Sequence, residues 1–188
     1  MKRIFWMMLL LAAFAGGEVQ AQRCLPGMKS LELRGGTVDG IDIGKAWYAG
    51  AALSVYARRA SRWVFGAEYL HKNYAYAAWS VPKEQFTAEG GYALCLLSDR
   101  SKSFLLSAGG AAILGYECSN RGEKLLPDGA RLLDGDVFLY GGAVTLEAEV
   151  YLGDRIVFAA SVRERVLWGS SIGKFHTQIS VALKFTFN

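Results

Sequence analysis

The sequence predicts an all-β protein: an eight-stranded antiparallel up-and-down transmembrane β-barrel that follows a cleaved signal peptide. Three observations carry this prediction. Apolar and polar residues alternate with a period of two, which is typical of strands with two different faces. The alternating stretches run to ~10 residues, close to the ~9–11 that a tilted membrane-spanning strand needs and longer than the ~5–6 of globular strands. Aromatic residues stand at both ends of the apolar faces, where rings meet lipid headgroups.

The start of the chain has the pattern of a secretory signal peptide. A lysine and an arginine precede an apolar stretch over residues 4–14, and Val19 and Ala21 supply small residues at a cleavage site. We therefore expect a signal peptide over 1–21. The alternative is an uncleaved membrane anchor, but the apolar stretch is shorter than the ~20 residues of a spanning helix. A lipoprotein would need a cysteine directly after the cleavage site, and Cys24 lies two residues beyond that position.

The composition is apolar, yet the chain has no long apolar run after the signal. Hydrophobic residues make up 52% of the 188 residues, and the mean hydropathy is +0.18. With 22 glycines and 3 prolines, this suits long uninterrupted strands. The net charge is +4, and the basic residues are scattered rather than clustered. Direct nucleic-acid binding is therefore not indicated.

Eight alternating segments follow the signal, and their connections alternate between short and long. The segments are 31–37, 47–58, 63–72, 86–96, 104–117, 138–151, 156–165 and 175–187. The short turns are 59–61, 98–101 and 153–154, and the longer segments are 39–45, 73–85, 118–134 and 169–174. Outer-membrane barrels have short periplasmic turns and longer external loops. We therefore expect both termini in the periplasm, with an N-terminal segment over 22–30 and the barrel over 31–188.

One face of the predicted strands is apolar, and the other carries many charges. The charged residues expected inside the barrel are Arg58, Glu68, Glu89, Glu117, Glu147, Glu149, Arg163, Arg165 and Lys184. An interior does not accept so many charges unless they pair or stay wet. Eight strands enclose a space just wide enough for side chains. We therefore expect a packed network of ion pairs, with an open pore as the alternative.

The aromatic residues decide between a membrane barrel and a soluble barrel of the lipocalin kind. A lipocalin-like barrel has the same alternation with the faces exchanged, so the period alone cannot separate the two. The aromatics that end the apolar faces are Trp47, Trp63, Tyr69, Phe86, Phe104, Tyr116, Phe138, Phe175 and Phe187. Their placement in two girdles favours the membrane, with lipid as the outer partner.

The sequence offers no catalytic, cofactor or metal motif. Cys24, Cys95 and Cys118 form no Cys-x-x-Cys pair, and their odd number leaves at least one thiol unpaired. Some outer-membrane barrels modify lipids with a rim histidine and a serine. Ser170 and His176 lie close in sequence, but no ordered Ser-His-Asp motif is visible, and a structural role for both is the simpler reading.

Several stretches of the mature chain resemble the TraO family of conjugative-transposon transfer proteins from Bacteroidetes. These stretches are Gln22-Arg23-Cys24-Leu25-Pro26-Gly27-Met28-Lys29, Gly35-Gly36-Thr37-Val38-Asp39-Gly40, Phe65-Gly66-Ala67-Glu68-Tyr69 and Gly90-Gly91-Tyr92. The resemblance implies a role in the apparatus that moves a mobile element between cells, together with other conjugation-apparatus proteins. It supplies no catalytic residue.

The expected function is therefore a non-enzymatic outer-membrane component of a conjugative DNA-transfer apparatus. The alternatives are a lipid-modifying barrel enzyme and a small general barrel that serves stability or adhesion. Genomic neighbours would separate them, because a transfer operon supports the first reading.

Overall fold

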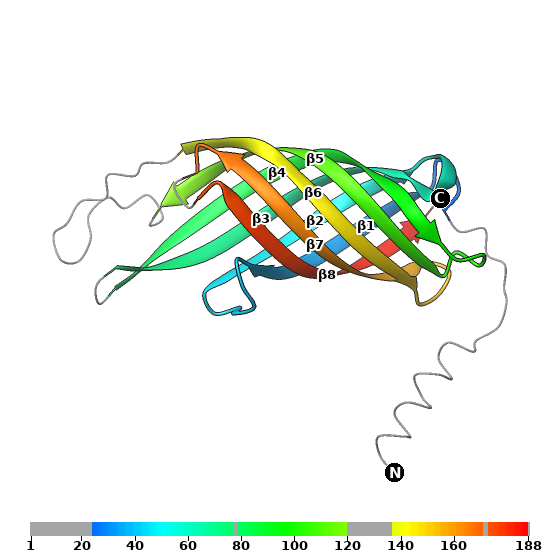
Figure 1. Cartoon of the computed structure of the whole chain (residues 1–188), viewed down its shortest axis with the longest axis horizontal. Helices are drawn as coiled ribbons and strands as arrows, with labels where there is room; N and C mark the ends of the chain where they lie inside the picture. Colours follow the sequence, from blue (N-terminus) through cyan, green and yellow to red (C-terminus); the bar gives the residue numbers. More distant parts are fainter. Residues whose placement is uncertain (1–23, 77–78, 120–136, 171–172, 188) are drawn as a thin grey trace, which may run out of the picture.

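The computed structural model describes residues 24–76, 79–119, 137–170 and 173–187, and in this part the chain forms one closed barrel. Figure 1 shows the strands running obliquely around a cylinder. The predicted signal peptide lies outside the described residues. Within them, no helix is long and apolar enough to cross a membrane.

Eight strands follow one another around the barrel in chain order. They are β1 (Lys29–Val38), β2 (Ala46–Tyr56), β3 (Arg62–Tyr76), β4 (Trp79–Ser98), β5 (Phe104–Ser119), β6 (Val137–Tyr151), β7 (Ile156–Trp168) and β8 (Phe175–Phe187). Each pairs antiparallel with its neighbour, and β1 closes the barrel against β8 over ten registered pairs from Lys29↔Phe187 to Val38↔Gln178. The predicted all-β, eight-stranded, antiparallel up-and-down barrel is confirmed.

The β3–β4 connection differs from the prediction. Residues 73–85 were expected to form a long loop, but β3 continues to Tyr76 and β4 begins at Trp79, so the two strands form a hairpin that projects beyond the barrel (Figure 1). Pro82 lies where β4 pairs with β3 alone. Pairing with β5 begins one residue later, at Lys83. A proline is tolerated at such an edge because its missing N–H removes no ladder hydrogen bond there.

The two ends of the barrel differ in their connections. One end carries residues 24–29, the C-terminus and the β2–β3, β4–β5 and β6–β7 turns, and we call it the terminal end (Figure 1). The β2–β3 turn includes a short 3₁₀ segment, η1 (Arg58–Ala60). The opposite end carries the β1–β2, β3–β4, β5–β6 and β7–β8 connections, and we call it the loop end.

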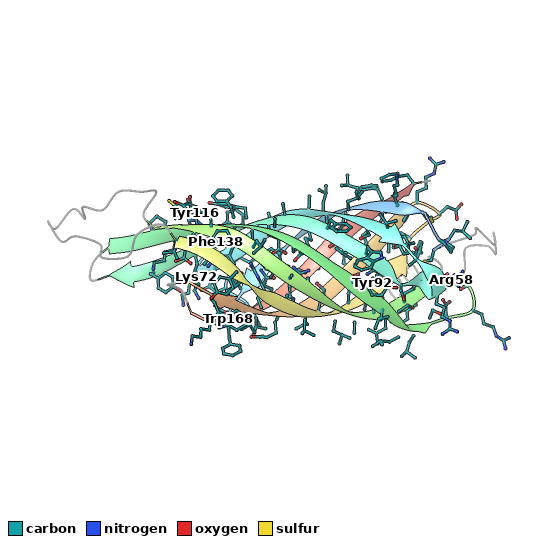
Figure 2. The ribbon with its side chains drawn as sticks, turned by 90° about the horizontal axis from the view of Figure 1, so that it is seen from above. Arg58, Lys72, Tyr92, Tyr116, Phe138 and Trp168 are labelled. Atoms are coloured by element: carbon teal, nitrogen blue, oxygen red, sulfur yellow. The ribbon has the colours of Figure 1, made fainter. Side chains whose placement is uncertain are left out.

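The two faces of each strand have opposite environments, as the alternation predicted. In β8 every second residue is buried, and the apolar residues between them are exposed. Leu146 on β6 is 50% exposed on the outer face. Outward aromatics lie in register on neighbouring strands near the loop end, in the pairs Tyr69↔Phe86, Phe86↔Tyr116 and Tyr116↔Phe138. Figure 2 shows Tyr116, Phe138 and Trp168 at that end and Tyr92 near the other.

Inward-facing glycines allow neighbouring strands to approach closely. A Cβ on Gly141 would overlap the backbone carbonyl oxygen of Val166 on β7, whereas a Cβ on outward-facing Gly110 would lie 3.9 Å from its nearest neighbour, the carbonyl oxygen of Ala143.

We expect Gly141→Ala to lower the free energy of unfolding by about 1–3 kcal/mol, because the clash involves backbone that can move only by distorting the sheet. Urea unfolding of barrels folded into lipid vesicles measures the change. The control is Gly110→Ala, which we expect to be close to neutral. Equal losses for the two variants would contradict the close approach of β6 and β7.

Candidate functional site: the charged and sealed lumen

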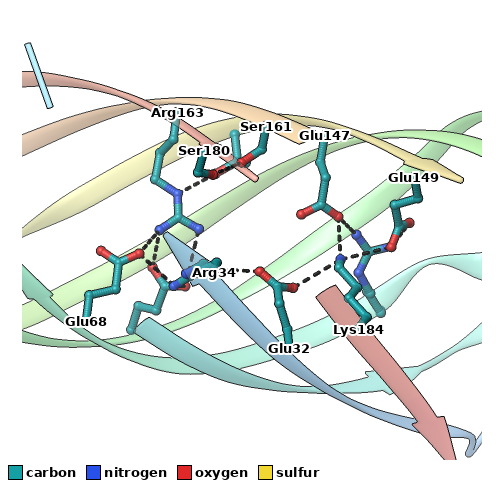
Figure 3. A network of polar contacts seen from close by, with 12 residues as sticks. Glu32, Arg34, Glu68, Glu147, Glu149, Ser161, Arg163, Ser180 and Lys184 are labelled. Atoms are coloured by element: carbon teal, nitrogen blue, oxygen red, sulfur yellow. Dashed lines mark hydrogen bonds and ion pairs between the residues drawn. The ribbon is translucent and has the colours of Figure 1, made fainter. Parts of the chain in front are cut away.

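Charged side chains from six strands meet inside the barrel and form two connected clusters. Figure 3 shows one cluster around Lys184 and the other around Arg163, with Glu32 between them. We call them the lysine cluster and the arginine cluster. Arg34 on β1 bonds Glu89 on β4, and these two strands are not neighbours in the sheet, so the contact crosses the lumen.

The lysine cluster lies nearer the terminal end and consists of Glu32, Arg62, Glu147, Glu149 and Lys184. The Nζ atom of Lys184 lies 2.5 Å from Glu147 Oε1 and 2.9 Å from Glu149 Oε1. It also lies 3.1 Å from Glu32 Oε2. Arg62 donates from Nη1 to Glu149 Oε2 at 2.8 Å and also pairs with Glu147. Lys184 is fully buried, so all its charge is balanced by these partners.

The arginine cluster lies nearer the loop end and consists of Arg34, Glu68, Glu89, Arg163 and Arg165. Arg163 Nη1 lies 2.6 Å from Glu68 Oε1 and 3.0 Å from Glu89 Oε2. Arg34 Nη2 lies 2.8 Å from Glu68 Oε1 and 2.5 Å from Glu89 Oε1. Arg165 Nη1 approaches Glu68 Oε2 at 3.4 Å. Each carboxylate therefore serves two or three guanidinium groups.

The two clusters balance each other in charge. The lysine cluster has three carboxylates and two basic groups, and the arginine cluster has two carboxylates and three basic groups. Arg34 Nη1 joins them at 3.6 Å from Glu32 Oε1. The network is therefore neutral as a whole. Since an uncompensated buried charge is expensive, a neutral and fully connected network is the arrangement that a narrow lumen can tolerate.

Seven of the nine residues predicted for the interior belong to these clusters. Of the other two, Glu117 is buried nearer the loop end, where it accepts hydrogen bonds from Gln85 Nε2 at 2.9 Å and Ser170 Oγ at 2.8 Å. The prediction for Arg58 was wrong, because β2 ends at Tyr56 and Arg58 is exposed in the turn that follows. Alternation gives the face of a residue but not the residue at which a strand ends.

Three network residues escaped the sequence-based prediction. Glu32 and Arg34 alternate with the outward leucines of β1, so the same period of two could have identified them. Arg62 stands two residues before Val64 on the inward face of β3, but it follows directly on a turn. Its position is fixed by pairing with Tyr56 on β2 and Ala93 on β4, which the sequence does not state.

A small cavity of about 40 Å³ lies beside the network. Small inward residues of β4 and β5, among them Gly91 and Ala111, leave this space opposite the long charged side chains. Arg34 Nε, Arg62 Nε and Ser107 Oγ belong to lining residues and have no hydrogen-bond partner among the described residues. A polar space of this size suits a few water molecules, and it is too small for a channel.

Apolar layers close the lumen on both sides of the network. At the terminal end, Cys24, Tyr56, Leu105, Tyr151 and Val157 form a buried cluster. Towards the loop end two further buried clusters follow, one of Val38, Ala46, Tyr48 and Leu70, the other of Ile113, Leu139, Ala143 and Leu167. The described lumen is therefore packed, with apolar clusters on both sides of the network and with the buried polar residues Glu117 and Gln85 towards the loop end. This packing does not fit an open pore.

Hydrogen bonds hold residues 24–28 in place at the terminal end of the barrel. The backbone N–H of Gly27 donates to the Tyr56 carbonyl at 2.8 Å, and the Tyr56 N–H donates to the Met28 carbonyl at 2.8 Å. Cys24 Sγ lies 3.1 Å from the Tyr151 hydroxyl. Burial raises the pKa of the Cys24 thiol despite this hydrogen bond, so the thiol is a poor nucleophile. Cys24, Cys95 and Cys118 form no disulfide with one another.

The histidine and serine considered for lipid chemistry contact different carboxylates. His176 Nδ1 lies 2.9 Å from Asp39 Oδ2, whereas Ser170 donates to Glu117. Burial raises the pKa of the Asp39 carboxyl, but the hydrogen bonds from Lys72 and His176 outweigh it and hold the pKa below its ordinary value. Asp39 thus anchors the loop end as an anion. Among the described residues, no three His, Cys, Asp or Glu side chains are placed to hold a metal ion.

The family of the chain is shown by a family model described as conjugative transposon protein TraO, which matches residues 25–187. The chain belongs to the TraO family. This confirms the resemblance seen in the sequence and implies that this TraO-family chain has a role in conjugative-transposon transfer. The comparison with curated proteins gives no match.

Solved structures similar to this TraO-family chain include outer-membrane barrels. The crystal structure of Neisserial surface protein A aligns with a TM-score of 0.56 at 10% identity, covering 85% of this chain and 97% of that one. The N-terminal β-barrel domain of Pseudomonas aeruginosa OprF aligns with a TM-score of 0.53 at 8% identity, covering 86% of this chain and 98% of that one. At these identities the likeness concerns the fold.

Proposed function

We propose that this TraO-family chain is a non-enzymatic outer-membrane component of a conjugative-transposon transfer apparatus. The observation that carries the proposal is a closed barrel in a transfer-protein family, with an apolar outer face and a lumen filled by a neutral charge network. Such a barrel offers a membrane anchor and a surface for partners. In the part that the structure describes, the lumen is filled by paired charges, which supports an anchoring role over conduction or catalysis.

The proposed location is the outer membrane, with both termini in the periplasm and lipid around the apolar face. The termini share the terminal end with the three short turns, and short turns are periplasmic in outer-membrane barrels. Residues 1–21 would direct export and be removed. The segment from residue 22 to the start of β1 at Lys29 would then lie on the periplasmic side, where other transfer proteins can reach it.

Transfer frequency tests the proposal. An in-frame deletion in donor cells should lower transfer of the mobile element, and the wild-type gene in trans should restore it. Growth and general permeability should stay unchanged, because the sealed lumen conducts little. In the same cells the protein should fractionate with the outer membrane and migrate differently on gels before and after heating. Undiminished transfer from the deletion donors would remove the proposed function and leave the fold intact.

A further inference from the structure

The terminal end of the barrel is strongly basic. Its surface segments, residues 24–29, 57–61, 99–103 and 152–155, carry six basic residues and two acidic ones. The basic residues are Lys29, Arg58, Arg59, Arg100, Lys102 and Arg155, and the acidic ones are Asp99 and Asp154. They come from the N-terminal segment and from every turn at this end, so the positive charge surrounds the closed mouth. We call this set of six the basic ring.

Most of the ring has no internal carboxylate partner. Among the described residues, no ion pair joins Lys29, Arg58, Arg59, Arg100 or Arg155 to an acidic side chain. These five residues are exposed, whereas Arg62, the first residue of β3, is buried in the lumen. Figure 2 shows Arg58 at the tip of the cylinder, beyond Tyr92. Such a surface attracts anionic partners from solution.

Asp99, the acidic residue of the β4–β5 turn, stabilises that turn by accepting hydrogen bonds within it. Asp99 Oδ1 accepts the backbone N–H groups of Ser103 at 2.7 Å and Phe104 at 3.1 Å, and Asp99 Oδ2 accepts the Ser101 hydroxyl at 2.5 Å. The Ser101 hydrogen bond, followed by the backbone ones, keeps the pKa of Asp99 below its ordinary value. Asp99 therefore fixes the backbone that presents Arg100 and Lys102.

The β2–β3 turn also holds its arginines in a fixed and strained backbone. Arg59 and Ala60 have φ of 58° and 59°, values that non-glycine residues rarely adopt. The turn is closed by a hydrogen bond of 2.7 Å from the Ala57 N–H to the Ser61 carbonyl. Glycine adopts such φ values without strain, so Arg59 is an unfavourable residue for a turn that only connects two strands.

The loop end lacks this excess of charge. Its described surface has three basic residues, Lys45, Lys72 and Lys174, and three acidic ones, Asp39, Asp42 and Glu84. Several of these pair, since Lys72 Nζ lies 2.6 Å from Asp39 and Lys45 Nζ lies 3.6 Å from Asp42. The positive excess is therefore a property of the terminal end rather than of the whole described surface.

The chemistry around the ring favours a protein partner. Leu25 and Leu152 are 37% and 66% exposed at the same end. Apolar and arginine side chains side by side are typical of protein interfaces. Single-stranded nucleic acid is bound with aromatic side chains on which bases stack, and the four surface segments contain no aromatic residue. Arg58 also lies at the tip of the cylinder, past the outward aromatic Tyr92 (Figure 2).

We propose that the basic ring docks an acidic, leucine-containing segment of a periplasmic partner protein. This inference rests on the proposed function, because it gives that function a partner surface and the chemistry of the partner. The closed mouth makes the ring a docking platform rather than the entrance to a channel.

Peptide binding tests the inference. The purified full barrel is placed in nanodiscs of zwitterionic phosphatidylcholine, and the probe is a fluorescent peptide rich in glutamate and leucine. The wild type should bind it, and binding should weaken as ionic strength rises. The quadruple variant replaces four arginines of the ring by glutamate: Arg58→Glu, Arg59→Glu, Arg100→Glu and Arg155→Glu. We expect its affinity for the peptide to fall by at least about ten-fold, the combined effect of four exposed contacts that each contribute modestly. The same peptide with glutamine in place of glutamate should not bind.

Matched controls separate this docking from other anion binding. Lys45→Glu with Lys174→Glu changes exposed charge at the loop end and should leave peptide binding unchanged. A conservative variant in which lysine replaces the same four arginines should retain most of the peptide binding. Failure of the wild type to bind, or equal binding by the four-fold glutamate variant, would overturn the inference. So would a single-stranded oligonucleotide or added anionic phospholipid that competes the peptide away, because either would identify a different ligand.

Transfer assays distinguish failure of this inference from failure of the proposed function. If the deletion abolishes transfer and the four-fold glutamate variant restores it fully, the docking surface is wrong and the proposed function stands. If the deletion leaves transfer unchanged, the proposed function is wrong whatever the peptide binds. Loss of transfer in the four-fold glutamate variant, with normal amounts of folded barrel and with peptide binding lost, supports both.

Discussion

Lys184→Met should lower the free energy of unfolding by about 3–5 kcal/mol, the usual cost of removing one partner from a buried ion-pair network. Lys184 is fully buried and lies within 3.1 Å of three carboxylates. Without it, Glu147 and Glu149 keep Arg62 as their ion-pair partner, and Glu32 keeps only Arg34 at 3.6 Å. Urea unfolding in lipid vesicles, read from the heat-dependent shift on gels, measures the loss.

Two further variants test whether charge is the cause. Lys174→Met removes an exposed lysine at the loop end and should change stability by less than about 0.5 kcal/mol. Adding Glu147→Gln to Lys184→Met should recover part of the loss, because it removes one of the three carboxylates that the lysine had balanced. A double variant that is less stable than Lys184→Met alone would show that packing, and not charge balance, sets the cost.

Leu146→Arg should cost about 2–4 kcal/mol, because it places a cation on the lipid face near the middle of a spanning strand. Leu146 points outward from β6 and is 50% exposed. The same substitution at Leu152, which is 66% exposed in the β6–β7 turn at the terminal end, should cost little. Folding into vesicles followed by urea titration compares the two. If Leu152→Arg were the more damaging, the outer face would not be the lipid face.

The faces of the barrel were predictable because a period of two is a local property. Thr145 and Leu146 are neighbours in sequence, and their opposite environments follow from the alternation of strand side chains. The number of strands and the alternation of short and long connections followed in the same way. Strand ends were less predictable, as Arg58 and the β3–β4 hairpin show, because hydrogen bonding to neighbouring strands decides where a strand stops.

The contacts inside the lumen were not predictable from the pattern. Alternation places Glu68 and Arg163 on inward faces, but their meeting across the barrel depends on the tilt and stagger of the strands. Glu32 and Arg34 were detectable on the same alternation and were missed, because the first strand was described by its outward residues. The closure of the mouth by Cys24 was beyond the pattern, since residues before the first strand carry no period.

The central claim is that this barrel serves conjugation through its place in the membrane and its surface, without chemistry at the loop end. The most direct test is the transfer frequency of the deletion donor complemented by the variant His176→Asn, Ser170→Ala. Asparagine can still donate to Asp39, so the loop end should keep its anchor, and gels should show normal amounts of folded barrel. We expect full restoration of transfer, as with the wild type. If this variant folds normally and fails to restore transfer, and the lipid composition of the membrane changes with it, the protein acts as an enzyme and our account is contradicted.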